Sequence, residues 1–403
     1  MKKVYIFLLI VLSTSAANAQ NWLPQSSGTS RRLSSVFFLN ADTGFIVGEG
    51  GTILKTINGG TNWTKQTAPT DTSLNSIYFV NENIGYIVGG NGTILKTING
   101  GVTWLNQISG TSLHLMSVYF TNADSGYAVG SNLNNSNGAI LQTKNGGANW
   151  TIQSSDAYPE FWSVYFTDEN TGIIVGRSWG DIYKTTDGGA TWSIFHSPTY
   201  WLFSVWFSNK DTGYAVGGYY GTSAILKTTN GGEHWDSQNS GVSTFLSSVY
   251  FIDSNIGYVV GEDGVILKTI DGGLNWKIQD SGTFDWLVSV FFTDANTGYA
   301  ISTWGSILKT INGGTGTSEV SNIDNNILVF PNPASDKITI DLRAFAHDQN
   351  ANITICNIQG EILLQTAVIH EKTDVSVGGW AKGVYFVKMY NNHTSRVMKF
   401  VKQ

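Results

Sequence analysis

The 403-residue sequence contains a single cysteine, Cys356, and only six prolines. One cysteine excludes an internal disulfide, so packing and hydrogen bonds must hold the folded chain together. Charged residues make up only 13% of the chain, and the formal net charge is −6. This balance gives no basic field for nucleic acid or an anionic membrane, and we expect neither as a partner. No segment beyond the N-terminus approaches about 18 consecutive apolar residues, so we expect no transmembrane segment.

The N-terminus has the three parts of a secretory signal peptide. Lys2 and Lys3 give a positive start, and residues 4–12 form an apolar run. Small residues at 17–19 then precede an expected cleavage site at Gln20. We therefore predict that residues 1–19 are a signal peptide and that the mature chain is exported.

Glycine and aromatic residues are abundant, and both recur in an internal repeat. Seven segments match the pattern Thr-x-(Asn/Asp)-Gly-Gly, at spacings of 41 to 46 residues. A period of this length is typical of a propeller or a solenoid. The third positions of the segments are Asn58, Asn99, Asn145, Asp187, Asn230, Asp271 and Asn312. In six of them a tryptophan follows three residues after the second glycine: Trp63, Trp104, Trp150, Trp192, Trp235 and Trp276.

Each repeat contains four short β-prone runs, separated by turns rich in Gly, Asn and Asp. In the first repeat we expect strands at 35–39, 44–48, 52–56 and 63–67. Four strands in about 42 residues predict one blade of a β-propeller.

A ring of blades makes a demand that a solenoid does not, because its two ends must meet. The seventh repeat lacks a fourth strand, since no tryptophan follows its two glycines. The missing segment is at the N-terminus, where residues 21–29 resemble residues 275–283 and Trp22 lies 41 residues before Trp63. We therefore predict an all-β fold, a seven-bladed propeller in which the N-terminal strand completes the last blade and leaves no open edge.

The repeated phrase Thr-x-(Asn/Asp)-x-Gly-x-x-Trp resembles the Asp box of sialidases, sortilin-type receptors and related BNR-repeat propellers. We expect the Asn or Asp side chain to bond the backbone two residues on, and the Trp to pack between blades. Together with phrases such as Gly-Tyr-Val-Val-Gly at 257–261, the box also resembles the photosystem II assembly and stability factor family. This resemblance implies a seven-bladed propeller. That family's role depends on a thylakoid partner, so we carry over the fold and not the function.

Two recurring charged positions have structural interpretations. Asp187 and Asp271 stand where calcium ligands could be placed, but five of the seven boxes have a neutral Asn there. A lysine also fills one blade position, so we interpret it as a structural stripe rather than a polyanion site: Lys55, Lys96, Lys184, Lys227, Lys268 and Lys309. We expect neither a metal nor a cofactor.

The loops of a propeller alternate between two faces. The strand 1–2 and 3–4 turns form one face and carry the repeated phrases, so we call it the repeated face. The strand 2–3 loops and blade connections form the other, the variable face, and differ between blades. Aromatic and charged side chains around its opening predict a binding site for a glycan or a surface protein. The candidate ligand-binding residues are Arg32, His114, Glu160, Arg177, Trp179, Trp201, Tyr219, Tyr220, Trp286 and Trp304.

Enzymatic alternatives have less support, and we assign no catalytic residue. A sialidase needs an arginine cluster, but the propeller has only Arg31, Arg32 and Arg177, and the adjacent pair should point apart on a strand. A glycoside hydrolase with a carboxylate pair is the alternative, because several carboxylates could face the rim. These are Glu49, Glu160, Glu262, Asp263 and Asp285. The histidines of the propeller, His114, His196 and His234, show no metal-ligand spacing. A scaffold that binds no small ligand is a further alternative.

A different pattern follows residue 316. After a polar linker at 317–326, alternation with period two, as in Lys-Ile-Thr-Ile-Asp-Leu at 337–342, predicts a small β-sandwich. Further strands are expected at 352–357, 383–390 and 396–403, with a turn at 359–360.

Three phrases of this segment closely resemble the type A sorting domain of type IX secretion cargo. They are Pro-Asn-Pro-Ala-Ser-Asp at 331–336, Gly-Val-Tyr-Phe-Val at 383–387 and the basic terminal strand. The resemblance implies handling by the type IX secretion machinery and passage through the periplasm to the exterior or the outer-membrane surface. We thus expect a signal peptide (1–19), a propeller (20–316), a linker (317–326) and a sorting domain (327–403), in a monomeric protein.

Overall fold

The computed structural model describes residues 22–132, 137–154, 160–177, 180–197, 201–314, 328–341, 352–357, 361–367, 372–390 and 395–403. The chain divides into two compact units, Met1–Gly314 and Thr315–Gln403. The expected signal peptide, linker and 359–360 turn lie outside the described residues.

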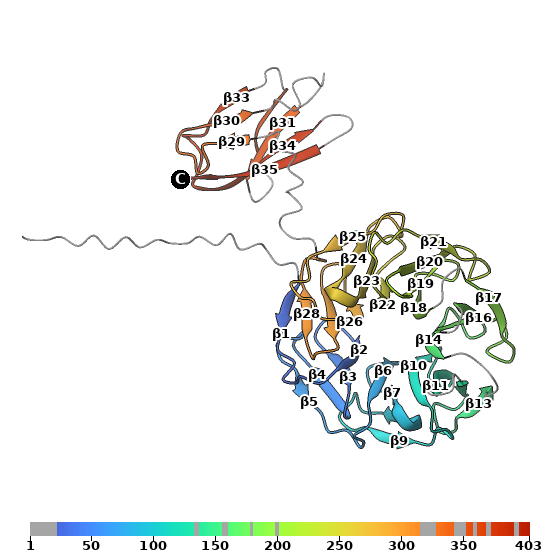
Figure 1. The fold of residues 1–403 in the computed structure, drawn as a ribbon. Coiled ribbons are helices and arrows are strands. Elements are labelled where there is room, and N and C mark those ends of the chain that lie inside the picture. The colour runs from blue at the N-terminus through green and yellow to red at the C-terminus, as the bar shows by residue number, and fades with distance from the viewer. Residues whose placement is uncertain are drawn as a thin grey trace, which may run out of the picture. The chain divides into compact units, whose positions relative to one another are not determined.

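The first unit contains seven antiparallel sheets of four strands, which surround a central axis as propeller blades (Figure 1). Blade one contains β2 (Leu33–Phe38), β3 (Gly44–Gly48), β4 (Thr52–Thr56) and β5 (Thr64–Lys65). Blade two contains β6 (Leu74–Phe79), β7 (Gly85–Gly89), β8 (Ile94–Thr97) and β9 (Leu105–Gln107). Blade three contains β10 (His114–Phe120), β11 (Gly126–Asn132), β12 (Asn137–Thr143) and β13 (Thr151–Ser154). Blade four contains β14 (Phe161–Phe166), β15 (Gly172–Gly176), β16 (Asp181–Thr185) and β17 (Ser193–His196). Blade five contains β18 (Leu202–Phe207), β19 (Gly213–Gly218), β20 (Ser223–Thr228) and β21 (Asp236–Gln238). Blade six contains β22 (Leu246–Phe251), β23 (Gly257–Gly261), β24 (Ile266–Thr269) and β25 (Lys277–Gln279). Short 3-10 turns, η1 (Gly90–Gly92) and η2 (Glu262–Gly264), connect the second and third strands of blades two and six.

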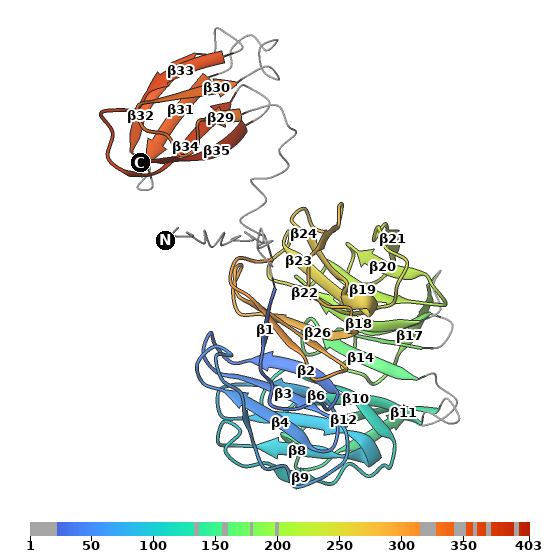
Figure 2. The same ribbon diagram turned by 60° about the vertical axis from the view of Figure 1, so that its left-hand side comes forward.

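The seventh blade joins the two ends of the propeller sequence. It consists of β26 (Leu287–Phe292), β27 (Gly298–Ser302), β28 (Ile307–Thr310) and the N-terminal β1 (Leu23–Gln25). β1 pairs antiparallel with β28, and both ribbon views show the blue β1 beside the orange strands of this blade (Figures 1 and 2). The predicted all-β fold and its closure by the N-terminal strand are confirmed.

The predicted strands of the first repeat are close to the observed ones. The second and third are as expected, while the first begins two residues earlier, at Leu33. The fourth strand is shorter than predicted and contains only Thr64–Lys65, because Trp63 ends the Asp-box turn and packs inward. Its indole makes edge-to-face contacts with Phe38 of its own blade and Tyr299 of the neighbouring blade.

The hydrogen bonding of the Asp box differs from the expected pattern. The bond across two residues is made by the threonine, since Thr56 Oγ1 accepts the Asn58 N–H at 3.3 Å. Asn58 Oδ1 instead accepts the N–H of Asn62, four residues on, at 3.0 Å. The reason is the pair of glycines between them. Gly60 has φ +77°, and a Cβ there would lie 2.8 Å from the Tyr299 ring, so the chain folds back tightly against the neighbouring blade.

The repeated lysines join neighbouring blades. Lys309 Nζ and the Tyr299 hydroxyl both donate to the carbonyl oxygen of Gly59, in the next blade's Asp box, at 2.6 and 2.8 Å. Lys55, Lys96 and Lys227 donate in the same way to Gly100, Gly146 and Gly272. In the third blade Gln142 replaces the lysine and donates to Gly188. This lysine stripe is accounted for by contacts between blades.

The second unit is a two-layer β domain. One sheet contains β29 (Leu328–Phe330), β30 (Lys337–Asp341) and β33 (Lys372–Ser376). The other contains β32 (Ile362–Ala367), β31 (Asn352–Asn357), β34 (Gly383–Tyr390) and β35 (Ser395–Lys402). Apolar side chains of both sheets form one core, among them Ile340, Ile355 and Phe400. The sequence predicted four of these strands and missed β29, β32 and β33.

Candidate functional site

A β-bulge near the start of each innermost strand builds the opening on the variable face. In the first blade Leu33 lies opposite Gly48 and Ser35 opposite Val47, so Ser34 is an extra residue without a cross-strand partner. Bulges re-aim side chains, and here the extra residue of every blade lines the same central cavity. These seven bulge residues are Ser34, Asn75, Met116, Trp162, Phe203, Ser247 and Val288.

Below the bulges, a ring of serines links adjacent blades. Each serine directly follows the bulge residue of its innermost strand, and its hydroxyl accepts the backbone N–H of the apolar residue that follows the equivalent serine in the neighbouring blade. Ser35 accepts from Ile77 at 3.4 Å, and Ser289 closes the circle by accepting from Val36 at 3.3 Å. The other five acceptors are Ser76, Ser117, Ser163, Ser204 and Ser248. This bonding fixes the angular position of every blade around the channel.

The cavity has two connected parts with different chemistry. The aromatic part, of about 260 Å³, is lined on blades four to seven by Trp162, Arg177, Trp201, Phe203, Phe245 and Trp286. The polar part, of about 790 Å³, is lined on blades one to three by Glu49, Asp71, Thr72, Ser73, Asn91 and His114. Arg32 and Arg177 line both parts. The opening is therefore amphipathic, with an aromatic wall facing a polar one.

Arg177 is the best-anchored charged group of the aromatic part. Its guanidinium carbon lies 4.4 Å from the Trp201 ring centroid and 6.0 Å from that of Trp162. Its Nη1 is 3.5 Å from Glu160 Oε2, in an ion pair whose side chains are 34% and 14% exposed respectively. The contact with indole and the pairing with a carboxylate hold the guanidinium against the wall.

The aromatic rings form a continuous array across three blades. Trp201 lies 6.0 Å from Phe245 with an interplanar angle of 22°, and Phe245 lies 6.4 Å from Trp286 at 19°. Tyr219 packs edge-on against Trp201 at 4.8 Å. Trp286 Nε1 donates to the Ser247 hydroxyl at 2.7 Å, so the indole at the end of the array is also positioned by a hydrogen bond.

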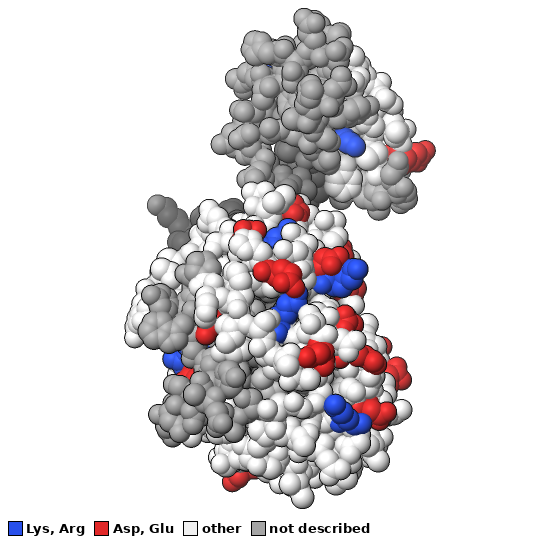
Figure 3. Space-filling model, turned by 90° about the vertical axis from the view of Figure 1, so that its right-hand side faces the viewer, with Lys and Arg blue, Asp and Glu red and all other residues white. Residues whose placement is uncertain are grey.

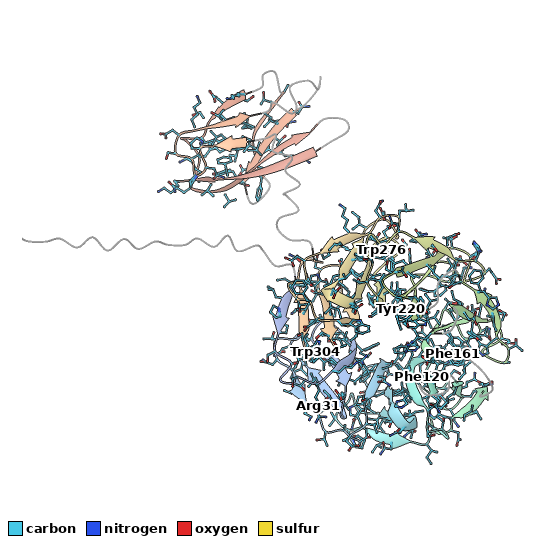
Figure 4. The ribbon with its side chains drawn as sticks, in the orientation of Figure 1. Arg31, Phe120, Phe161, Tyr220, Trp276 and Trp304 are labelled. Carbon is cyan, nitrogen blue, oxygen red and sulfur yellow. The ribbon has the colours of Figure 1, made fainter. Side chains whose placement is uncertain are left out.

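Eight of the ten residues proposed from the sequence lie in or against this cavity. Five line it, namely Arg32, His114, Arg177, Trp201 and Trp286. Three contact lining residues, namely Glu160, Tyr219 and Tyr220. Trp304 is 71% exposed and lines neither part, and Trp179 lies outside the described residues. Figure 4 shows Tyr220 near the central opening and the Asp-box Trp276 farther out, beside β25.

Sequence reasoning missed the bulge residues, of which Trp162 and Phe203 contribute rings to the aromatic wall. The sequence nevertheless contains a pattern that could have identified these residues. The residue after the first large apolar side chain of each innermost strand differs in almost every blade, whereas its neighbours barely change.

The carboxylates considered for a hydrolase are largely dispersed. Of the five, only Glu49 lines the cavity. Glu160 is paired with Arg177, and Asp285 Oδ2 accepts hydrogen bonds from Ser302 and Ser306. Arg32 lines the cavity and Arg31 does not, as expected for adjacent side chains that point apart. Arg31 instead donates a hydrogen bond to the Gly50 carbonyl at 3.1 Å.

Three further findings concern the described part of the chain. It contains no group of three His, Cys, Asp or Glu side chains arranged to hold a metal ion. None of its helices is long and apolar enough to cross a bilayer. On the side of the molecule in Figure 3, lysine and arginine side chains are scattered among acidic ones and form no continuous basic patch.

Comparison with known proteins identifies both units. The family model described as Photosynthesis system II assembly factor YCF48 matches residues 14–161 and 197–282. The model described as Secretion system C-terminal sorting domain matches residues 328–403. A curated relative is the chloroplastic photosystem II stability/assembly factor HCF136 of Oryza sativa subsp. japonica. It is 41% identical over 66 residues, which are only 16% of this chain and 15% of that protein.

Solved structures resemble the propeller at low sequence identity. YCF48 bound to D1 peptide aligns with a TM-score of 0.61 and 20% identity, over 73% of this chain and 97% of that one. An ancestral GH74 enzyme aligns with a TM-score of 0.59 and 14% identity, over 94% of this chain and 63% of that one. At these identities the likeness shows the fold alone. Because its family model matches more than half of the residues, the chain belongs to the photosynthesis system II assembly factor YCF48 family, and its type IX secretion sorting domain indicates a secreted or cell-surface location.

Proposed function

We propose that this protein is an exported binding module that captures a glycan in the variable-face cavity. The observation that carries the proposal is the opposition of an aromatic wall and a polar wall across one opening. A pyranose ring has the same division, with an apolar face of C–H groups and an edge of hydroxyls. Aromatic faces stack on the former, while carboxylate, amide and imidazole groups bond the latter.

The geometry supports a sugar of a few residues. The polar part, about 790 Å³, is within the size range of small-molecule sites, and the aromatic part, about 260 Å³, extends it by slightly less than the smallest such site. Trp201 and Phe245 are held by their neighbours before any ligand arrives, so little conformational entropy is lost on binding.

A segment of a surface protein is the second candidate ligand. A related propeller of this family has been solved bound to D1 peptide. In the present chain, Arg32 and Arg177 line the same cavity and would pair with an acidic side chain or a terminal carboxylate. A polypeptide would then place its apolar side chains on the aromatic wall.

A glycan array probed with the full mature chain tests the first proposal, and a peptide array displaying acidic and aromatic segments tests the second. We expect retention of a defined set of glycans, released by free oligosaccharide of the same structure. Binding to peptides alone would transfer the site to the second ligand. Release of reducing ends from a retained polysaccharide would instead favour a hydrolase, and no binding on either array would favour a scaffold.

A further inference from the structure

A closed belt of seven aromatic side chains surrounds the channel at the end opposite the variable face. Each belt residue is the penultimate residue of its innermost strand. Neighbouring ring centroids are 4.6 to 5.6 Å apart all the way round, and Phe291 closes the circle on Phe37 at 5.3 Å. The members are Phe37, Tyr78, Tyr119, Tyr165, Trp206, Tyr250 and Phe291.

All seven belt residues line one cavity of about 380 Å³. Its remaining lining residues are serines, valines and an isoleucine, so no charged side chain of the described propeller lines it. The serine hydroxyls already accept N–H groups from adjacent blades, as in the bond from Val205 to Ser163. The hydroxyls of Tyr165 and Tyr250 donate to the carbonyls of the neighbouring blades' innermost strands at 3.1 and 3.0 Å. An anion would find no cationic partner here, and a strongly hydrated group would lose its water without replacement.

The turns around this end of the channel are acidic. Each innermost strand leads directly from its belt residue into a strand 1–2 turn, and every one of the seven turns contains a carboxylate. The carboxylate residues are Asp42, Glu82, Asp124, Asp168, Glu169, Asp211, Asp253 and Asp294, against a single Lys210. Adjacent turns are in contact, since Asn122 Nδ2 donates to Glu169 Oε1 at 2.7 Å. The repeated lysines lie close to the same turns, since Lys309 Nζ donates to the carbonyl of Gly59, whose N–H donates to the carbonyl of Asp42. Because these cations offset much of the acidic charge, any preference of the belt for cations must come from its aromatic rings.

We propose that the belt cavity is a second ligand site and that it binds a quaternary ammonium group. Aromatic faces attract cations through their quadrupole, and a methylated ammonium has a low hydration cost and an apolar surface that suits an uncharged cavity. A simple ammonium or guanidinium would need hydrogen-bond acceptors, which are already occupied in much of the lining. The site is independent of the variable-face proposal, because it uses different side chains at the other end of the channel.

Calorimetric titration of the full mature chain with choline tests the site. The control ligand is 3,3-dimethyl-1-butanol, in which a neutral carbon replaces the charged nitrogen at nearly the same size. We expect choline to bind and the neutral compound to bind about tenfold more weakly or worse, because only the cation interacts with the ring quadrupoles. Equal affinities would show an apolar cavity only, and absence of choline binding at about 10 mM would overturn the proposal.

Matched variants locate the site on the belt. Tyr119→Leu should weaken choline binding about fivefold, because one of the seven rings is lost. Tyr119→Phe should retain most of the affinity, because the ring face and not the hydroxyl makes the contact. Phe284→Ala changes an aromatic side chain that is 91% exposed and lines neither channel cavity, and should leave binding unchanged. Melting temperatures of all three variants identify unfolding. An unchanged affinity in a folded Tyr119→Leu protein, or a loss of binding in a folded Tyr119→Phe protein, contradicts the assignment.

Discussion

Leu23 lies directly opposite Lys309 in an antiparallel pair, so β1 is the last strand of the seventh blade. Beside it, Trp22 is fully buried and makes edge-to-face contacts with Tyr258 and Phe292. The ring is thereby closed by backbone pairing and by an aromatic side chain at once. In a propeller this junction connects the most distant parts of the sequence, so its loss should affect the whole unit.

Deletion of residues 20–28 should lower propeller stability strongly, because it exposes the edge of β28 and empties the Trp22 site. Trp22→Ala alone should cost about 3 to 5 kcal/mol, as for other buried aromatic truncations. Denaturant unfolding monitored by fluorescence measures both effects. The half-exposed Leu23→Ala is the control, with little expected change. An unaltered midpoint in the deletion variant would refute closure by β1.

The hydrogen bonds between blades should contribute individually. Tyr299→Phe removes the hydroxyl that donates to Gly59 and should cost about 1 kcal/mol, while Lys309 still donates to the same carbonyl. The first blade offers the reverse change, since Phe45 occupies the equivalent position and Gly100 receives only the Lys55 bond there. Phe45→Tyr should therefore stabilise by about 0.5 to 1 kcal/mol. Chemical denaturation of both variants provides the values. A stabilised Tyr299→Phe protein or a destabilised Phe45→Tyr protein would contradict this role of the hydroxyl.

Acid should act on the two boxes that contain aspartate. Hydrogen bonds from Thr191 and Asn275 lower the pKa values of Asp187 and Asp271 from 3.8 to about 2. The folded state thus holds each charge where the unfolded chain takes up a proton. The resulting stability is present above pH of about 4 and is lost as the pH falls toward about 2.

The double variant Asp187→Asn, Asp271→Asn should therefore lose less thermal stability than the parent between pH 7 and pH of about 2.5. The five boxes with asparagine show that the turn accepts the amide. Melting temperatures at the two pH values provide the test. Parallel losses in parent and variant would mean that these carboxylates do not contribute to acid sensitivity.

Export should depend on the second unit. Removal of residues 328–403, which match the sorting domain, should leave a folded propeller in the periplasm of its native host. Fractionation and immunoblotting of cells and medium follow the protein. A variant without residues 1–19, the proposed signal peptide, is the control and should stay in the cytoplasm. Undiminished appearance of the truncated chain outside the outer membrane would rule out a sorting role for this unit.

The fold was largely predictable because the repeat imposes the same local interactions seven times. Turn chemistry around Asn58 and its equivalents, and the register of Trp22, were sufficient to infer blades and closure. The predicted hydrogen bonding of the Asp box was wrong in detail. Two successive glycines with positive φ fold the chain back, and the spacing of residues in the sequence does not show this.

The candidate site was only partly predictable. Loop residues such as Trp201 and Arg177 differ between blades and could be found by comparing repeats. Trp162 was missed because an alternating strand would not be expected to turn that side chain into the channel, and only the bulge does so. The aromatic belt was missed because its residues recur in every blade. A recurring aromatic residue is usually interpreted as part of the core, and only the structure shows that the innermost strands face a channel.

The central claim is that the variable-face cavity is the ligand site, and Trp201→Ala tests it most directly. Its indole contacts Arg177, Tyr219 and Phe245, so its loss dismantles the aromatic wall. Trp235→Ala is the matched control, because this buried Asp-box tryptophan should reduce stability by about 3 to 5 kcal/mol without touching the cavity.

The decisive measurement is the dissociation constant of a glycan or peptide ligand identified on the arrays, for the parent and both variants at a temperature where all are folded. We predict that Trp201→Ala weakens binding at least about fivefold, since a stacked aromatic contributes about 1 kcal/mol beyond its buried area. Trp235→Ala should bind like the parent. Equal affinity of parent and Trp201→Ala would contradict the account, because it would place the ligand elsewhere on the protein.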